Sequence, residues 1–362
     1  MKFKSTTNLG EIAPRLAFID NSKGIAIIFV VIGHVVYHCI CGKNNSMAYT
    51  HPIFILLQSF HMPLFIFLSG ILVSNQSQNF KEVMSFSYKK FRQLLVPFLI
   101  IGGALTIANG KGIETLLTSS MKSGYWFLLT LFELFILHSL KLLVQHEKKG
   151  NKLTFDVLLT IFTYLCLYSI NELWGNTAIG GIVGIGHLCT YYPYFAVATI
   201  VKKCDYTDKL FESELFLTAA LIVVFCKMIL VRTGLNIAGY GFLLSLSYLY
   251  LCIAIMYRLE DTHNVVTNTL GYLGRNSLYI YVFHYFLIIN TPLWFVQSFT
   301  NDNSLVLDII IITIPTALII LLSLLFGNLI KECHTLHKNY IWTLVYLTII
   351  NEKNRINDLA PC

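Results

Sequence analysis

Apolar stretches long enough to cross a lipid bilayer recur along almost the whole chain, and they constrain its fold more than any other feature. A run of about 18 apolar residues with few charges is typical of a membrane-spanning helix. Of the 362 residues, 56% are hydrophobic and only 12% are charged, which is about half the charged fraction of an ordinary soluble domain. We therefore predict an all-α polytopic membrane protein without a second soluble domain.

These stretches predict about ten transmembrane helices. They are expected near residues 24–42, 54–73, 93–109, 124–143, 154–171, 187–201, 213–231, 240–257, 270–297 and 305–330, which together form one transmembrane domain over 24–330. Residues 1–23 are predicted to be a cytoplasmic segment without a cleaved signal peptide. Residues 331–362 are predicted to be a cytoplasmic tail, whose segment IWTLVYLTII is too short to span and suits an interfacial helix.

The basic residues orient the predicted helices. With a cytoplasmic N-terminus, twenty-one of the 26 lysines and arginines fall on the cytoplasmic side and four in outside loops, as the positive-inside rule requires. Both termini are then cytoplasmic. The net charge of +7 is explained by topology and by anionic phosphates at the membrane surface, and we expect no nucleic-acid partner. The nine cysteines show no CxxC pair or metal-ligand spacing, so we expect no metal.

A lysine and a histidine lie within the first predicted helix, FIDNSKGIAIIFVVIGHVVYH. Eleven residues turn an α-helix through about 1100°, so Lys23 and His34 share a face and lie about 16 Å apart along its axis. One extended anionic ligand could therefore contact both. The alternative makes Lys23 a snorkelling flank and His34 a packed, hydrogen-bonded residue. His38 shares this face, but an HxxxH pair without a third ligand is weak evidence for a metal.

Further polar residues are predicted inside or beside the bilayer. His61, Glu133 and His284 lie at a similar depth to His34, and ionisable groups at that depth are by default functional. The alternative is that each makes a hydrogen bond between helices. Arg275 lies at the cytoplasmic end of its helix.

Two basic residues precede the third predicted helix in SYKKFRQLLVP. Lys89 and Arg92 are three residues apart and so share a helical face. They either anchor the helix to the cytoplasmic side or bind the phosphates of a nucleotide.

Six motifs in a fixed order resemble the acyltransferase 3 family of integral membrane acyltransferases. They are D-x-x-K-G with the basic-x10-His spacing of Lys23 and His34, FHMPLFIFLSG, the Lys89 and Arg92 pair followed by Pro97, WFLLTLF, YFAVATIVKK and LGRNSLYIYVFH. The resemblance covers nearly the whole chain. Two positions depart from the family pattern: Lys89 stands where arginine is usual, and Ala198 where glycine is common.

The resemblance implies a function that the residues alone do not supply. Members of the family transfer an acyl group, usually acetyl, from cytoplasmic acyl-CoA to a cell-envelope glycan or lipid-linked sugar. His34 would be the general base or form an acyl-histidine, and Lys23, Lys89, Arg92 and Arg275 would bind coenzyme A phosphates. Glu133, His61 and His284 would bind the acceptor, orient His34 or move protons. The expected location is the plasma (inner) membrane, where membrane lipid and a second copy of the chain, in a homodimer, are candidate partners.

Two other functions compete with this interpretation. A secondary transporter or flippase also needs ionisable groups within the membrane, but repeat symmetry with broken helices in matching halves is typical of it and is not visible in this sequence. An inactive scaffold would keep the architecture and lose the Lys23 and His34 pair, which this sequence retains. The sequence therefore favours the acyltransferase.

Overall fold

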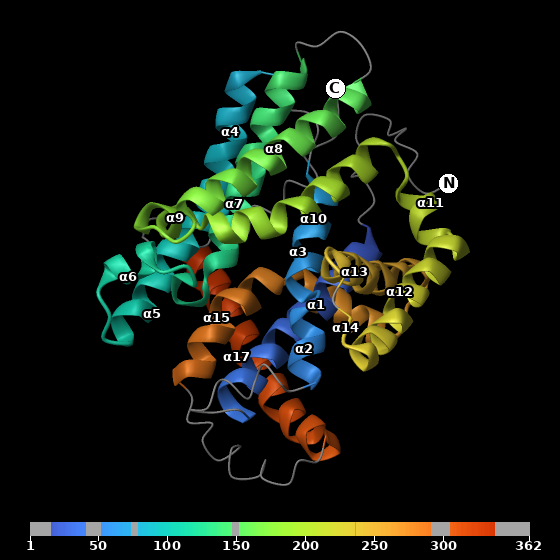
Figure 1. Cartoon of the computed structure of the whole chain (residues 1–362). Coiled ribbons are helices and arrows are strands. Elements are labelled where there is room, and N and C mark those ends of the chain that lie inside the picture. Colours follow the sequence, from blue (N-terminus) through green and yellow to red (C-terminus); the bar gives the residue numbers. More distant parts are fainter. Residues whose placement is uncertain are drawn as a thin grey trace. The chain divides into compact units, whose positions relative to one another are not determined.

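The computed structural model describes residues 16–40, 52–73, 79–146, 152–235, 237–290 and 305–336, and these residues form helices and no strand (Figure 1). The all-α prediction is confirmed. The chain divides into two compact units: unit 1 is Met1–Phe65 with Thr207–Leu329, and unit 2 is Ile66–Tyr206 with Ile330–Cys362.

The helices of unit 1 are α1 (Ala17–Val35), the π-helical turn η1 (Val36–Ile40), α2 (Pro52–Gln58), α11 (Thr207–Glu212), α12 (Glu214–Thr233), α13 (Tyr240–Arg258), α14 (Val265–Arg275) and α15 (Ser277–Asn290). Those of unit 2 are α4 (Phe80–Lys90), η3 (Phe91–Leu95), η4 (Phe98–Gly102), α5 (Gly103–Ala108), α6 (Ile113–Thr118), η5 (Lys122–Gly124), α7 (Trp126–His146), α8 (Lys152–Trp174), α9 (Ala178–Val183) and α10 (Ile185–Lys203). Helices α3 (His61–Leu72) and α17 (Leu305–Leu336) each belong partly to both units.

Eight helices of the described residues are long and apolar enough to cross a membrane, which supports an integral membrane protein. They are Ala17–His38, Ile53–Leu72, Phe80–Ala108, Trp126–Gln145, Leu153–Trp174, Glu214–Thr233, Tyr240–Arg258 and Ile312–Ile330. The sixth predicted helix, 187–201, lies within α10; its histidine, tyrosines and lysines make it less apolar than these eight. The predicted interfacial helix in the tail lies outside the described residues.

The predicted helix boundaries differ most from the structure at the third and ninth helices. The third helix begins at Phe80 rather than near residue 93, because a helical backbone continues through the charged residues where the apolar pattern stops. The ninth was expected to be continuous over 270–297, but α14 ends at Arg275 and α15 begins at Ser277. Between them, the Asn276 side chain donates to the Tyr272 carbonyl at 2.9 Å, so a side chain takes part in ending the first helix. Residues 291–297 lie outside the described part.

Glycines bring α1 and α14 into direct contact in unit 1. A Cβ atom on Gly24 would lie 2.1 Å from the Leu270 carbonyl oxygen, and one on Gly274 would lie 1.8 Å from that of Asp20. Neither position can carry a side chain at this spacing, so the two backbones touch, as is common where small residues line helix contacts in membranes. Gly24 of the D-x-x-K-G motif therefore fixes the position of Lys23, its neighbour in sequence.

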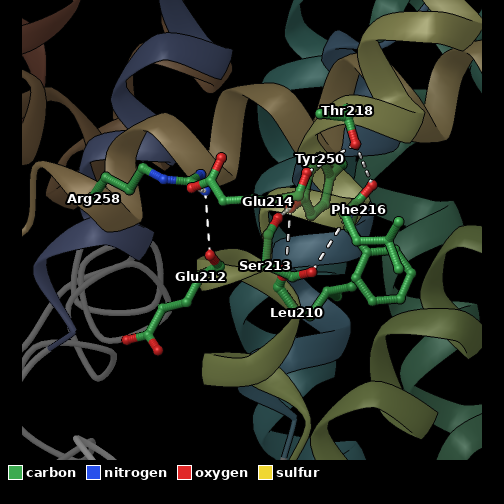
Figure 2. Close-up of polar contacts among 9 residues, drawn as sticks. Leu210, Glu212, Ser213, Glu214, Phe216, Thr218, Tyr250 and Arg258 are labelled. Carbon is green, nitrogen blue, oxygen red and sulfur yellow. Dashed lines mark hydrogen bonds and ion pairs between the residues drawn. The ribbon is translucent and has the colours of Figure 1, made fainter.

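A polar corner joins α11 and α12 to α13, also in unit 1 (Figure 2). The Tyr250 hydroxyl lies 3.0 Å from the Leu210 carbonyl oxygen and 3.2 Å from that of Ser213. Arg258 forms an ion pair with Glu214 at 3.0 Å. The Tyr250 hydroxyl gives a partner to the Leu210 carbonyl, and the Arg258 guanidinium, at 3.4 Å, to that of Glu212; both carbonyls lie at the end of α11, where no partner within the helix is available.

Unit 2 contains a buried ion network between α7, α8 and α10. The two carboxylate oxygens of Asp156 face Lys141 Nζ at 2.5 Å and Lys203 Nζ at 2.9 Å. Lys141 also donates to Thr160 at 2.8 Å, and Lys203 to the Gln145 side-chain oxygen at 3.1 Å. From the sequence, both lysines are expected only to mark the cytoplasmic side. The structure shows that they also pair with a carboxylate inside the unit.

Candidate active site

Helix α1 carries both residues of the predicted Lys23 and His34 pair. It runs without interruption from Ala17 to Val35, so the continuous helix that the predicted common face requires is present. Lys23 is half-buried and makes no hydrogen bond or ion pair with the described residues. The backbone then widens into the π-helical turn η1, which carries His38.

Three histidines and a tyrosine of unit 1 come together and form a group that we call the histidine cluster: His34, His38, His284 and Tyr285. The His34 ring centroid lies 5.2 Å from that of His284 and 6.2 Å from that of His38. Tyr285 packs edge-on against His34 at 5.0 Å and against His38 at 5.6 Å. The structure thus brings together two predicted site residues, His34 and His284, that lie far apart in the sequence.

The hydrogen bonds of His284 determine which of its nitrogens is available. Its Nδ1 lies 2.7 Å from the Tyr281 carbonyl oxygen and 3.1 Å from that of Ile280. A carbonyl oxygen only accepts, so Nδ1 carries a proton and, in the neutral ring, Nε2 is an acceptor. Nε2 is buried and has no hydrogen-bond partner among the described residues. Such an orphaned atom is rare in a folded protein and marks a place where a ligand or a water can bind.

His61 lies outside the histidine cluster. It is buried at the start of α3, and its Nδ1 donates to the Leu57 carbonyl oxygen at 2.5 Å. It interacts electrostatically with His34, but no ring contact joins it to the cluster within the described residues. His61 therefore lies near His34 without packing against it.

Arg275 lies near the segment of α1 that carries Lys23. Built on Gly271, a Cβ atom would be 3.2 Å from Arg275 Nη1 and 3.0 Å from Asn21 Oδ1. The missing side chain of Gly271 thus makes room for the guanidinium beside Asn21, two residues before Lys23. No sequence pattern singles out Asn21, because only the contact between α1 and α14 places it there.

The other predicted residues belong to unit 2. Lys89 lies in the last turn of α4 and Arg92 in η3. The Arg92 guanidinium lies 5.8 Å from the centre of the Tyr88 ring, and its Nε is buried without a hydrogen-bond partner in the described part of the chain. Glu133 lies on α7; its Oε2 is likewise buried and unpartnered, and the carboxylate interacts electrostatically with Lys122.

The predicted topology places Lys122 among the basic residues of the outside loops, yet its side chain is almost fully buried, with 1% exposed. It donates to the carbonyl oxygens of Leu117, Gly181 and Ile182, the last two at 2.5 and 3.0 Å. Burial lowers the pKa of its ammonium group, and Glu133 opposes that shift. No sequence pattern signals this role, because the acceptors belong to the ends of two other helices.

No group of three or more histidine, cysteine, aspartate or glutamate residues in the described ranges is arranged to hold a metal ion. In the histidine cluster the imidazole rings are in contact, and hydrogen bonds to backbone carbonyls hold His284 in place. This arrangement suits proton transfer.

Comparison with known proteins gives one family and one distant relative. Residues 16–327 match the family of acyltransferase domains known as acyltransferase 3. The chain is also similar to the nodulation protein NolL of Mesorhizobium japonicum, with 31% identity over 129 residues, which are 33% of this chain and 34% of the relative. The chain thus matches about a third of the length of that relative. No solved structure matches significantly.

Proposed function

Because the chain belongs to the acyltransferase 3 family, we propose that it transfers an acyl group, specifically acetyl, from cytoplasmic acetyl-CoA to a sugar hydroxyl. The acceptor would be a cell-envelope polysaccharide or a lipid-linked glycan, and the protein would act in the plasma membrane. The observation that carries this proposal is the contact between His34 and His284. His34 of the family's basic-x10-His motif contacts the imidazole of His284 among membrane-spanning helices, and His284 Nε2 has no hydrogen-bond partner among the described residues.

In this proposal His34 is the general base. It takes the proton of the acceptor hydroxyl as the oxygen attacks the thioester carbonyl, which forms a tetrahedral intermediate. The intermediate expels the coenzyme A thiolate, the new ester remains on the sugar, and the proton passes from His34 to the leaving sulfur. A transient acyl-histidine is a second chemical route to the same products. His284 would orient His34 or accept a proton from it through Nε2.

Basic side chains at the predicted cytoplasmic end would bind the donor. In unit 1, Lys23 and Arg275 make no ion pair within the described residues, so their charges are available to phosphate. In unit 2, Lys89 and Arg92 provide two further cations. An ammonium binds phosphate as a point charge and a guanidinium binds it through a fork of donors, so the pair suits the several phosphates of coenzyme A.

Mass spectrometry of surface glycans tests this function. Native cells that express the protein should carry the mass of one acetyl group on the modified sugar, and cells without it should lose that mass. Cells that express only His34→Ala should resemble the cells without the protein. If the glycans are chemically unchanged but depleted from the surface, the protein is a transporter and the proposal fails.

A further inference from the structure

An aromatic group in unit 2 takes no part in the chemistry described above. We call Trp126, His187 and Tyr191 the aromatic platform. Trp126 is the first residue of α7, while His187 and Tyr191 are one turn apart near the start of α10. The indole centroid lies 4.2 Å from the His187 ring and 5.0 Å from the Tyr191 ring, with interplanar angles of 16° and 19°. Three nearly parallel rings thus lie together at the ends of two helices.

The distances show that one face of the indole has no ring against it. Parallel rings on opposite faces of the indole would be at least about 7 Å apart, twice the closest contact of ring carbons. The centroids of His187 and Tyr191 are only 6.4 Å apart, so both rings lie on the same face. Within the described residues no other ring stacks on Trp126, whose remaining ring contact is edge-on, with Phe127. Trp126 is also only half-buried.

Of the polar atoms at the edges of the platform, one is hydrogen-bonded and three make no hydrogen bond with the described residues. His187 Nε2 donates to the Ser120 carbonyl oxygen at 3.2 Å, so Nδ1 of the neutral ring is an acceptor. The Trp126 indole N–H and the Tyr191 hydroxyl make no hydrogen bond with the described residues. Two turns further along the Trp126 side of α7, at the i+7 position, lies Glu133 with its orphaned Oε2.

Hydrogen bonds of Lys122 connect the segments that precede the two helices of the platform. Lys122, four residues before Trp126, bonds to the Gly181 and Ile182 carbonyl oxygens just before α10 begins. The starts of α7 and α10 are therefore tied together independently of the three rings. A rigid site binds more tightly because fewer side chains must be ordered on binding.

A flat apolar face edged by hydrogen-bond donors and acceptors is the chemistry that recognises a sugar ring. The C–H groups of a pyranose are slightly positive and pack on the negative face of an aromatic ring, while its hydroxyls bond to the polar atoms at the edge. The predicted topology puts the starts of α7 and α10 at the outer side of the membrane, where envelope glycans occur. We propose that the aromatic platform binds a sugar of the acceptor. This inference relies on the proposed function for its choice of ligand.

A competing explanation is that these rings belong to the aromatic belt that anchors membrane proteins at the lipid headgroups. Equilibrium binding distinguishes the two. The protein would be purified in lipid nanodiscs and titrated with envelope glycan in the absence of acetyl-CoA. The glycan would come from native cells that lack this protein, and its O-acyl esters would first be removed with mild base. Trp126→Ala should raise the Kd for this glycan about five- to tenfold, and Trp126→Phe should keep most of the affinity. Trp174→Ala, which removes an exposed indole at the end of α8, is the matched control and should bind normally.

The affinity for acetyl-CoA shows whether each variant is folded, and it should be unchanged. If Trp126→Ala fails to fold, Tyr191→Phe takes its place; it keeps the ring and should weaken glycan binding about threefold through loss of a hydrogen bond. Wild-type glycan affinity in a folded Trp126→Ala or in Tyr191→Phe would overturn the inference.

Transfer assays on the same samples separate the two proposals. If Trp126→Ala transfers acetyl and binds the glycan normally, only the glycan-binding role of the aromatic platform is refuted. If glycan binding depends on Trp126 but the wild type transfers no acetyl group, only the proposed acyltransferase activity is refuted.

Discussion

The histidine cluster of unit 1 and the ion network of unit 2 are both groups of polar side chains among apolar helices, but only the network pairs opposite charges. In the network, both carboxylate oxygens of Asp156 face a lysine. In the cluster, His284 uses only one ring nitrogen, and the other is buried with no hydrogen-bond partner in the described part of the chain. Breaking a buried pair of opposite charges destabilises a fold, whereas an imidazole nitrogen without a partner is left for a ligand or a proton. We therefore expect the network to support the fold and the cluster to support the chemistry.

The largest expected effect comes from breaking the network. Asp156→Ala leaves the ammonium groups of Lys141 and Lys203 close together without their carboxylate, and removing one partner of a buried ion pair costs about 3–5 kcal/mol. Thermal unfolding in detergent should show a large loss of stability and of purified yield. Glu172→Ala, which removes an exposed carboxylate from the same helix, should have little effect. If Asp156→Ala unfolds normally but has lost acetyl transfer, the network belongs to the mechanism.

Removing the imidazole of His34 should have the opposite result, a loss of activity without a loss of stability. His34→Ala should lower the turnover number about 100-fold or more, because a general base typically contributes that much, while the unfolding temperature changes little. His263→Ala removes an exposed histidine before α14 and should leave both quantities unchanged. Turnover within a few-fold of wild type in the folded His34 variant would remove this residue from the mechanism.

A smaller effect is expected from the basic pair of unit 2. Lys89→Gln with Arg92→Gln should raise the KM for acetyl-CoA about tenfold and change turnover less, because phosphate binding is the same in the ground and transition states. Steady-state kinetics would measure both constants. The exposed Lys81 on the same helix provides the control Lys81→Gln. Unaltered binding of coenzyme A to the double variant would make the pair a topological anchor.

The smallest effect on turnover is expected at His284, and it tests what this residue does in the histidine cluster. His284→Asn keeps a polar side chain near the same carbonyl groups but removes the nitrogen at Nε2. If His284 positions His34 or accepts its proton, turnover should fall about tenfold and the pH dependence of turnover should change shape. The KM for acetyl-CoA should stay the same. An unchanged pH profile with unchanged turnover would leave His284 with a packing role only.

Several features followed from the sequence alone. Spanning helices were predictable because each backbone group inside a bilayer must be bonded within its own segment, which makes long apolar runs helical. For the same reason Lys23 and His34 were correctly predicted to lie on one continuous helix, α1. The ordered motifs also indicated the family that residues 16–327 match.

Contacts between distant segments were decided only by the tertiary structure. Gly24 and Gly274 let two backbones touch, and this approach sets which residues of α14 lie beside α1. The meeting of His34 with His284 and the pairing of Lys141 with Asp156 depend in the same way on how helices pack within each unit. Helical periodicity gives the face on which a residue lies, but not the helix that this face will meet. That choice depends on the shapes of side chains brought together from far apart in the sequence, and no local pattern records it.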